Sequence, residues 1–389
     1  MSSRPTRVAV RSAAGLQVLQ VLLVLPCLVA AVVGCASGAG GSAHRPSGAG
    51  AGGGTGHASP ASAAKSGPGR GSTGSAGRSG GDITLAFAGD VHFTGRTARL
   101  LRHPAAAFGP IAGLLRSADL TLVNLETAIT TRGKPQLKYY HFRTGPVAFT
   151  ALRDAGVDVA NMANNHVLDY GRVGLADTLA AARNARFPVL GIGANATAAW
   201  APHVVTVKGV RIAFLGVSQV AELASSWVAT ATRSGEANSI NLRRTLAAVR
   251  AAKRVADIVI VIMHWGTEGQ ACPDANQLAL APKLAAAGAD VIVGSHAHTL
   301  QGSGWLGHTF VAFGMANFLW WEASYSTDTG VLLLTLHPHG PLTERFVPAT
   351  VSRTGQPVVD TGRAARKARA RYRSLRACTG LSARPGRGH

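Results

Sequence analysis

Short apolar runs alternate with alanine-rich stretches along most of the chain, from residue 82 to residue 351. The apolar runs have the length of strands, and the alanine-rich stretches repeat apolar residues at helical spacing. Predicted strands cover residues 83–88, 120–125, 157–162, 187–192, 203–207, 210–217, 258–263, 291–293, 310–313 and 331–336. Predicted helices cover residues 96–115, 146–155, 174–185, 242–255 and 275–287. This alternation predicts a layered α/β (α+β) fold. A hairpin at Lys208-Gly209 adds antiparallel pairing, so we expect one mixed sheet or two sheets packed face to face.

Residues 1–35 have the three parts of a secretory signal. Three arginines precede an apolar run over residues 16–33, which is short for a membrane-spanning helix, and small residues follow it. The sequence Val32-Val33-Gly34-Cys35 resembles a bacterial lipobox, in which Cys35 would become a lipidated N-terminus; the alternative is an ordinary signal with an incidental cysteine. Residues 36–81 are rich in Gly, Ser and Ala, which predicts a disordered tether. We therefore expect a protein that is lipid-anchored at the extracellular face of a bacterial membrane, or secreted.

The formal net charge of +21 is concentrated toward the two ends of the chain. Residues 352–389 form a basic segment in which no acidic residue follows Asp360. No nucleic-acid recognition motif accompanies the basic residues, so we expect no nucleic-acid binding. Attraction to anionic wall polymers, acidic lipids or a polyanionic substrate is the better explanation.

Cys272 and Cys378 are the cysteines that follow the predicted signal and tether. Two cysteines in an oxidising compartment usually pair, which predicts a disulfide between the C-terminal segment and the loop after Trp265. Two free buried thiols are the alternative. Neither cysteine has a partner at CxxC spacing, so neither is expected to bind metal.

Acids, amides and histidines are concentrated directly after the apolar strands of a domain that is otherwise poor in charge. In open α/β sheets, ligands bind outside the carboxyl ends of the strands, so these side chains can meet in one cleft. Their oxygen and imidazole donors suit divalent metals. The predicted metal ligands are Asp90, His92, Glu126, Asn165, His264, His296 and His298. We assign Asp90 and His92 to one ion and Asn165 and His264 to a second, with Mn, Fe and Zn as the ions considered. Any one of these residues alone would be an ordinary polar loop residue, so the prediction depends on the whole set.

Other residues near these strand ends are candidates for catalysis and binding. His166 follows a predicted ligand and would suit a general acid or a donor to an oxyanion. The candidate substrate-binding residues are Arg143, Asn124 and Asn317, although Arg143 could equally be a plain loop cation. Three aromatic residues either line the cleft or belong to the core, namely Trp320, Trp321 and Tyr325. Four histidines are expected to be structural or on the surface, namely His103, His141, His203 and His308.

In order and spacing, the strand-end motifs resemble those of the CapA family, which is named for poly-γ-glutamate capsule proteins and is similar in fold to calcineurin-type metallophosphoesterases. The resemblance covers residues 83–350 and rests on Gly89-Asp90, Asn124-Leu125-Glu126, Asn165-His166 with Asp169 and Gly171, His264-Trp265-Gly266, Gly294-Ser295-His296-Ala297-His298 and Gly314 to Asn317-Phe318. It implies a four-layer α-β-β-α domain over residues 82–351 with a divalent-metal site, in which His166 and Asp169 are catalytic. Glu126 stands where the superfamily has Asp, and His92 stands where CapA relatives usually have an apolar residue.

Three functions are compatible with these features. The first is a metal-dependent hydrolase or transferase that acts on an anionic surface polymer such as poly-γ-glutamate, or on a phosphoester. The second is a non-catalytic protein that binds or anchors the polymer, with a structural metal site. The third is a scaffold in a membrane-bound synthase complex, docked through the basic tail. Retention of nearly every ligand-type residue favours the enzyme.

Overall fold

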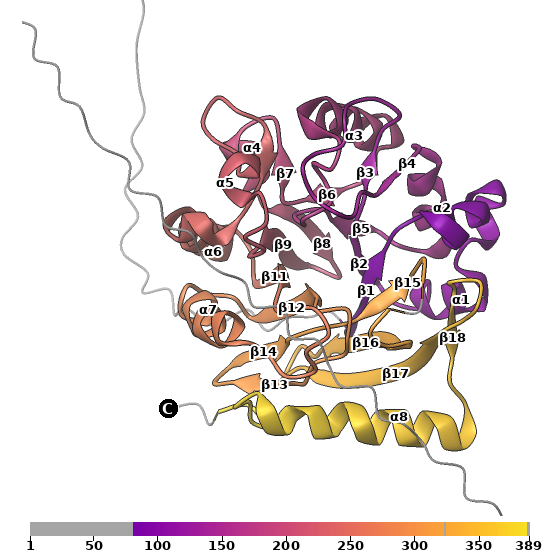
Figure 1. Ribbon diagram of the computed structural model, residues 1–389. Helices are drawn as coiled ribbons and strands as arrows, with labels where there is room; N and C mark the ends of the chain where they lie inside the picture. Colours follow the sequence, from indigo (N-terminus) through magenta and orange to yellow (C-terminus); the bar gives the residue numbers. More distant parts are fainter. Residues whose placement is uncertain (1–80, 323, 387–389) are drawn as a thin grey trace, which may run out of the picture. The chain divides into compact units, whose positions relative to one another are not determined.

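A computed structural model describes residues 81–322 and 324–386, and two β-sheets form the centre of this part of the chain (Figure 1). The predicted signal peptide, Cys35 and all of the predicted tether except Gly81 lie outside the described residues. None of the helices in the described ranges is long and apolar enough to cross a membrane.

The first sheet has eight strands around β1, which pairs in parallel with β2 and antiparallel with β16. Its order is β18 (Pro357–Val359), β17 (Thr343–Val351), β16 (Asp328–Leu336), β1 (Ile83–Val91), β2 (Leu120–Leu125), β5 (Val159–Asn161) and β6 (Val189–Leu190), with β15 (Asn317–Leu319) beside β1. The second sheet has six strands, in the order β13 (Ser303–Leu306), β14 (Thr309–Ala312), β12 (Val291–His296), β11 (Ile258–Trp265), β9 (Val210–Ser218) and β8 (His203–Val207). Both sheets are mixed, as the sequence predicted.

Helices and short ladders surround the two sheets. The α-helices are α1 (Ala112–Leu115), α2 (Val147–Ala155), α3 (Gly171–Ala185), α4 (Ala196–Ala199), α5 (Ala224–Trp227), α6 (Leu242–Val255), α7 (Ala275–Ala286) and α8 (Gly362–Ser374). The two-stranded ladders are β3 (Ala128–Ile129) with β4 (Arg143–Thr144) and β7 (Ile192–Gly193) with β10 (Gly235–Glu236).

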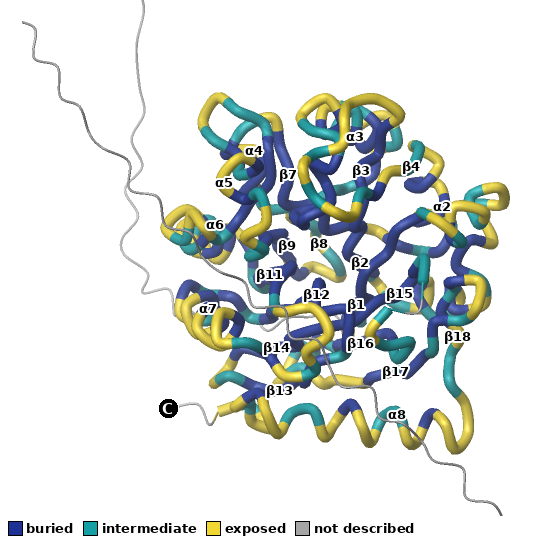
Figure 2. Tube along the Cα trace, in the orientation of Figure 1, coloured by how far each residue is buried: buried dark blue, intermediate teal, exposed yellow. Residues whose placement is uncertain are grey.

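Three buried apolar clusters show how the layers are stacked. Leu85 and Phe87 of β1 pack against Phe214 and Ile260 in a cluster between the two sheets. Because side chains alternate along a strand, Ala86 of β1 belongs instead to the cluster that joins the first sheet to α2 and α3. A third cluster joins the second sheet to α6 and α7, which lie on its outer side (Figure 1). The predicted four-layer α-β-β-α fold is confirmed, and Figure 2 shows the buried strands at its centre.

Two predicted elements differ from the structure where glycine or proline interrupts the pattern. The predicted helix over residues 96–115 is wrong. That segment forms three short 3-10 helices followed by α1, because Pro104 and Pro110 lack a donor N–H and Gly109 has a φ of +63°. The predicted strand over residues 187–192 is split into β6 and β7 at Gly191, which has a φ of +76°.

The C-terminal segment after residue 351 packs against the rest of the described domain. Strand β18 extends the first sheet, and α8 packs on β17 through Tyr372, whose ring stacks on Phe346 at a centroid distance of 3.9 Å. A disulfide joins Cys272 to Cys378, just beyond α8. Figure 1 shows α8 running along the edge of the domain beneath β17.

A buried acid in β10 makes the stability of the domain depend on pH. Glu236 is fully buried; its Oε1 accepts a hydrogen bond from Asn238 at 2.9 Å, and its Oε2 has no partner among the described residues. Burial raises the pKa of Glu236 to about 8, although Asn238 and Lys138 lower it in part. The folded pKa of Glu236 lies above the unfolded value, so the folded state holds the proton more tightly than the unfolded state does. The resulting contribution to the free energy of unfolding is fully present below about pH 4, where Glu236 is protonated in both states. It is lost as the pH rises toward about 8.

We therefore expect Glu236→Gln to stabilise the protein at pH 8.5, by an amount on the order of a few kcal/mol in the free energy of unfolding, and to have little effect at pH 4.5. Thermal unfolding of the wild type and the variant at both pH values measures this difference. A melting-temperature difference that is the same at pH 4.5 and pH 8.5 would show that burial does not raise the pKa of Glu236.

Candidate metal centre

The carboxyl ends of β1, β2, β11 and β12 bring five predicted metal ligands together, as the sequence led us to expect. Their ligand atoms form overlapping groups in which all atoms lie within 4.8 Å of one another. One group is Asp90, Glu126 and His298, and another is Glu126, His264 and His296. All five side chains are buried. The donors are carboxylate oxygens and imidazole nitrogens, which is a set that Mn, Fe and Zn bind.

Unusual backbone geometry brings the strand ends close together. His296 and His298 have φ angles of +88° and +55°, a region that non-glycine residues rarely adopt. A Cβ atom at Gly89 would lie 1.8 Å from the Ala316 carbonyl oxygen, and one at Gly294 would lie 1.9 Å from the Phe313 carbonyl oxygen. Backbone strain of this kind persists where the surrounding structure enforces it, which is common at functional sites.

Asn124 is hydrogen-bonded to two of the predicted ligands. Its Nδ2 donates to Asp90 Oδ1 at 2.8 Å and lies 3.2 Å from His264 Nδ1, while its Oδ1 accepts from Asn161 at 2.9 Å. Asn317 has a similar place, because its Oδ1 lies 2.7 Å from His298 Nδ1. Both amides are 1% exposed. Their hydrogen bonds run to Asp90 and His298, and they are not among the described residues that line the cavity, so the structure places them as groups that could orient metal ligands.

The predicted pair of Asn165 and His264 is brought together. His264 Nε2 lies 2.8 Å from Asn165 Oδ1, and its Nδ1 lies 3.0 Å from Ser295 Oγ. Burial lowers the pKa of His264 and of His296 well below the usual value, and neighbouring histidines add to the effect. Both imidazoles are therefore neutral at neutral pH, which is the form that binds metal.

Two ligand atoms in this cluster are buried without a hydrogen-bond partner among the described residues. They are Glu126 Oε1 and His296 Nδ1. Burial and the neighbouring carboxylate of Asp90 raise the pKa of Glu126 well above its usual value. A buried acceptor without a partner costs about 1–3 kcal/mol, and a divalent cation would satisfy both atoms. The residues present therefore fit a divalent metal.

His92 does not share the surroundings of the other predicted ligands. Its ring is fully buried, stacked on Phe142 at a centroid distance of 4.3 Å and in edge contact with Trp320. It belongs to none of the ligand groups found among the described residues, and neither ring nitrogen has a hydrogen-bond partner there. Burial lowers the pKa of His92 well below the usual value, so the ring is neutral.

His166 and Asp169 form a hydrogen-bonded pair beside the ligand cluster. His166 Nδ1 lies 2.7 Å from Asp169 Oδ2, and its Nε2 lies 3.8 Å from Glu126 Oε1. The main-chain N–H of Phe142 donates to Asp169 Oδ2 at 2.6 Å, and Lys138 Nζ lies 3.2 Å from Asp169 Oδ1. Burial raises the pKa of Asp169 to about 7, with Lys138 opposing the shift, and burial lowers the pKa of His166. Asp169 thus fixes the orientation of the His166 ring.

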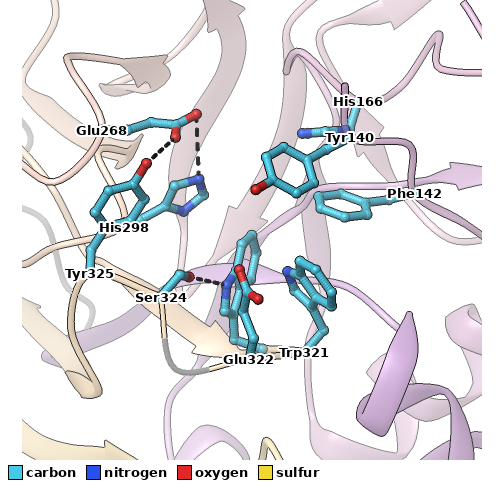
Figure 3. Close-up of a pocket in the computed structure, with 10 residues that line it drawn as sticks. Tyr140, Phe142, His166, Glu268, His298, Trp321, Glu322, Ser324 and Tyr325 are labelled. Carbon is cyan, nitrogen blue, oxygen red and sulfur yellow. Dashed lines mark hydrogen bonds and ion pairs between the residues drawn. The ribbon is translucent and has the colours of Figure 1, made fainter. Parts of the chain in front are cut away.

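A cavity of about 200 Å³ lies next to these residues (Figure 3). Its aromatic lining consists of Tyr140, Phe142, Trp320, Trp321 and Tyr325. Its polar lining consists of His166, Glu268, His298, Glu322 and Ser324. The three aromatic residues that the sequence left open between cleft and core therefore line the cavity. A hydrogen bond to Glu268 raises the pKa of Tyr325 to about 12, and partial burial adds to it.

Arg143, a predicted substrate-binding residue, is not among the described residues that line this cavity. It follows Phe142, which lines the cavity, and successive side chains point to opposite sides of an extended chain. The Arg143 guanidinium lies 4.5 Å from the centre of the Tyr170 ring, where it makes a cation–π contact.

Sequence reasoning missed three charged residues of the site, namely Glu268, Lys138 and Glu322, of which Glu322 follows Trp321 and lines the cavity. Glu268 follows β11 and forms a third ligand-type group with His296 and His298. The rule that selected His264 could have selected it, since both lie at the end of the same strand. The side chain of Lys138 is 2% exposed. Its Nζ pairs with Asp169 and lies 3.0 Å from Glu222 Oε2. It lies in an irregular loop between β3 and β4 that carries no pattern to single it out.

Comparisons with known proteins agree with the motifs. Residues 84–320, which contain every predicted metal ligand, match the family described as "Bacterial capsule synthesis protein PGA_cap". The chain is 28% identical over 279 residues to "Capsule biosynthesis protein CapA" of Bacillus anthracis, covering 69% of this chain and 67% of that protein. It is 30% identical over 251 residues to "PGA biosynthesis protein CapA" of Bacillus subtilis strain 168, covering 61% of this chain and 63% of that protein.

Among solved structures, the NAD nucleotidase NadN of Haemophilus influenzae matches with 16% identity and a TM-score of 0.44, over 79% of this chain and 65% of that one. Similarity at this level carries no argument about function. The family match covers more than half of the chain and includes the whole ligand cluster. The chain therefore belongs to the bacterial capsule synthesis protein family PGA_cap, as the CapA resemblance predicted.

Proposed function

We propose that this protein is a divalent-metal-dependent hydrolase or transferase that acts in the synthesis of a capsule or cell-surface polymer such as poly-γ-glutamate. The observation that carries the proposal is the ligand cluster, in which Glu126 Oε1 and His296 Nδ1 are buried without a partner among the described residues. Most buried polar atoms have a hydrogen-bond partner within the protein, and here two atoms without one lie in a single cluster of ligand-type side chains. The names of the relatives support the polymer part of the proposal.

Six residues would hold the metal, about two ions in number as in other two-metal hydrolase sites. They are Asp90, Glu126, Asn165, His264, His296 and His298. A divalent metal bound there acts as a Lewis acid that polarises the scissile group. Asn124 and Asn317 orient the ligands through their hydrogen bonds to Asp90 and His298.

His166 is the proposed acid or base. Its Nδ1 faces Asp169, which leaves Nε2 on the side of the cavity and of Glu126. With the proton held on Nδ1 by Asp169, Nε2 can accept a proton from an attacking group and return it to the leaving atom. The stacked ring of Phe142, at a centroid distance of 4.1 Å, limits the tilt of the imidazole.

The proposed place of action is the outer surface of the cell, with Cys35 as the lipid-anchored residue and residues 36–81 as the tether. The disulfide between Cys272 and Cys378 supports this proposal, because disulfides persist mainly in oxidising compartments. The anionic polymer is the proposed partner, together with the membrane that the anchor enters.

The test uses the full chain and two histidine variants. Elemental analysis measures bound metal, and turnover is measured on a generic phosphodiester and on γ-linked polyglutamate. We expect about two equivalents of transition metal in the wild type. For His264→Ala and His296→Ala we expect turnover to fall by about 100-fold or more. His308→Ala is the matched control, since His308 is exposed and lies outside the ligand groups.

A folded protein that binds no metal, and turns over neither substrate after metal is added, would contradict the proposal. A non-catalytic role in binding or anchoring the polymer would then be the better account. Loss of turnover in His308→Ala to the same extent as in His264→Ala would show that the assay does not report on this site.

A further inference from the structure

The cavity beside the metal centre combines aromatic rings with carboxylates (Figure 3). Its outer walls include the rings of Tyr140, Trp321 and Tyr325, and His166 and His298 lie at its inner end. A group bound in the cavity would therefore lie directly beside the group on which the metal centre acts. The chemistry of the outer walls indicates what such a group can be.

Two carboxylates in the cavity have no lysine or arginine partner among the described residues. Glu268 Oε2 accepts a hydrogen bond from Tyr325 Oη at 2.8 Å, and its Oε1 lies 3.9 Å from His298 Nε2. Glu322 lines the same cavity beside Trp321. No lysine or arginine is among the described residues that line the cavity. A carboxylate or phosphate entering it would therefore meet two like charges.

The basic residues close in sequence to the cavity residues Tyr140 and Phe142 make their contacts with groups other than Glu268 and Glu322. Lys138 pairs with Asp169 and Glu222, and its amine also lies 5.3 Å from the centre of the Trp227 ring. Arg143 lies over Tyr170. Asp90 and Glu126 belong to the proposed metal ligands. Glu268 contacts the ligand His298 only at 3.9 Å and lines the cavity, and Glu322 belongs to none of the ligand groups found among the described residues, so these two carboxylates carry the negative charge of the cavity itself.

The aromatic walls favour a cation as well. The faces of Trp and Tyr rings carry negative potential and attract ammonium groups, most strongly where water is partly excluded. The backbone of Tyr325 is strained, since its φ is +53°. Its ring lies parallel to that of His298 at a centroid distance of 5.9 Å, and Glu268 holds its hydroxyl. The loop after β15 and the loop after β11 thus hold an aromatic face and a carboxylate at the same point.

We propose that this cavity binds a protonated amine of the molecule on which the metal centre acts. Glu268 and Glu322 supply the negative charge, and Tyr140, Trp321 and Tyr325 supply the aromatic faces. The inference rests on the proposed function in one respect, which is that the cavity lies beside a metal centre that acts on a bound molecule.

This chemistry selects a particular part of the proposed polymer. A γ-linked polyglutamate carries a carboxylate on every residue and a single ammonium group at its amino end. A cavity that prefers ammonium to carboxylate would bind the amino end of the chain, or a separate amine that accepts a transferred group. In both cases the body of the polyanion stays outside the cavity.

The experiment compares three probes of matched length on the metal-loaded full chain: butylammonium, butanol and butyrate. Binding is followed by tryptophan fluorescence, since Trp320 and Trp321 line the cavity. We expect butylammonium to bind about tenfold more tightly than butanol, and butyrate to bind most weakly. We expect Glu268→Gln and Glu322→Gln each to weaken butylammonium binding by about fivefold or more. Glu344→Gln is the matched control, because Glu344 pairs with Arg376 and does not line the cavity.

Butyrate binding as tightly as butylammonium would overturn the inference, as would full affinity in both cavity variants. Reduced metal content in Glu268→Gln would also overturn it, because Glu268 would then serve the metal rather than an amine.

The two sources of amine are separated with a γ-linked tri-glutamate whose amino end is free or acetylated. Weaker binding after acetylation identifies the chain end, and no change identifies a separate acceptor. Since the readout needs no turnover, amine selectivity without catalysis would contradict only the proposed function.

Discussion

Glu126→Gln is expected to raise the stability of the metal-free protein while removing most of the stabilisation that metal provides. The Glu126 carboxylate is fully buried beside Asp90, and its Oε1 has no hydrogen-bond partner among the described residues. Without metal, burial and the Asp90 charge oppose ionisation of Glu126. An amide avoids that repulsion. With metal, the same carboxylate belongs to two of the ligand groups, so its loss weakens the site.

The size of the metal effect follows from mass action. At a metal concentration about 100 times the dissociation constant, binding stabilises the wild type by about 2.7 kcal/mol. Loss of one ligand should weaken affinity by about 100-fold or more, so the variant should lose nearly all of this stabilisation. Melting temperatures of both proteins, with chelator and with added Mn, Fe or Zn, measure both parts of the prediction.

Glu344→Gln is the control for the metal-dependent part alone, because Glu344 lies outside the ligand groups; metal should stabilise this variant as much as it stabilises the wild type. A variant that is less stable than the wild type without metal, and equally stabilised by metal, would show that Glu126 is a structural acid. That outcome would also weaken the proposed function, which places Glu126 among the ligands.

Removing the disulfide is expected to produce the second large effect, a loss of about 2–4 kcal/mol in the free energy of unfolding. The bond joins Cys272 to Cys378 across a sequence separation of 106 residues, so it restricts a long loop in the unfolded chain. It also holds the end of α8 against the second sheet, where Arg376 donates to the Ser303 carbonyl oxygen at 2.5 Å. Without the bond, α8 remains attached mainly through Tyr372, Arg371 and Arg376.

Calorimetric unfolding with and without reductant tests this expectation. The Cys272→Ser/Cys378→Ser double variant should melt about 5–10 °C below the oxidised wild type, and reductant should not lower its melting temperature further. Metal content should be unchanged, since both cysteines lie outside the ligand groups. Equal melting temperatures for the wild type and the double variant would show that the packing of α8 alone holds the C-terminal segment.

The strongly positive charge of the chain does not extend into the cavity. Exposed basic residues gather on α8, including Arg363, Arg366 and Lys367, whereas the described lining of the cavity contains Glu268 and Glu322. The net charge of +21 therefore describes the ends of the chain and not the site. A polyanion would be attracted to the protein surface as a whole, while the cavity itself favours a cation.

The pattern of apolar and polar residues predicts the layered fold and identifies the side chains that follow the strands. Apolar strands alternating with helices require layers, and the carboxyl ends of parallel strands meet at one edge of a sheet. This rule brings Asp90 together with Glu126 on the first sheet, and His264 with His296 and His298 on the second, and the packing of the two sheets then joins the two sets. Prolines and the glycine at position 109 altered only the segment that was predicted to be helical over residues 96–115.

Which neighbours of those ligands face the cavity depends on the tertiary structure and could not be predicted from the strand pattern. Asn124 and Asn317 are hydrogen-bonded to ligands, Arg143 lies over Tyr170, and His92 is enclosed by Phe142 and Trp320. Position along a strand end cannot distinguish these cases, because one residue of shift reverses the direction of a side chain. Lys138 and Glu322 come from irregular loops, whose paths follow no period. Their places depend on long-range contacts that exist only after the two sheets have packed together.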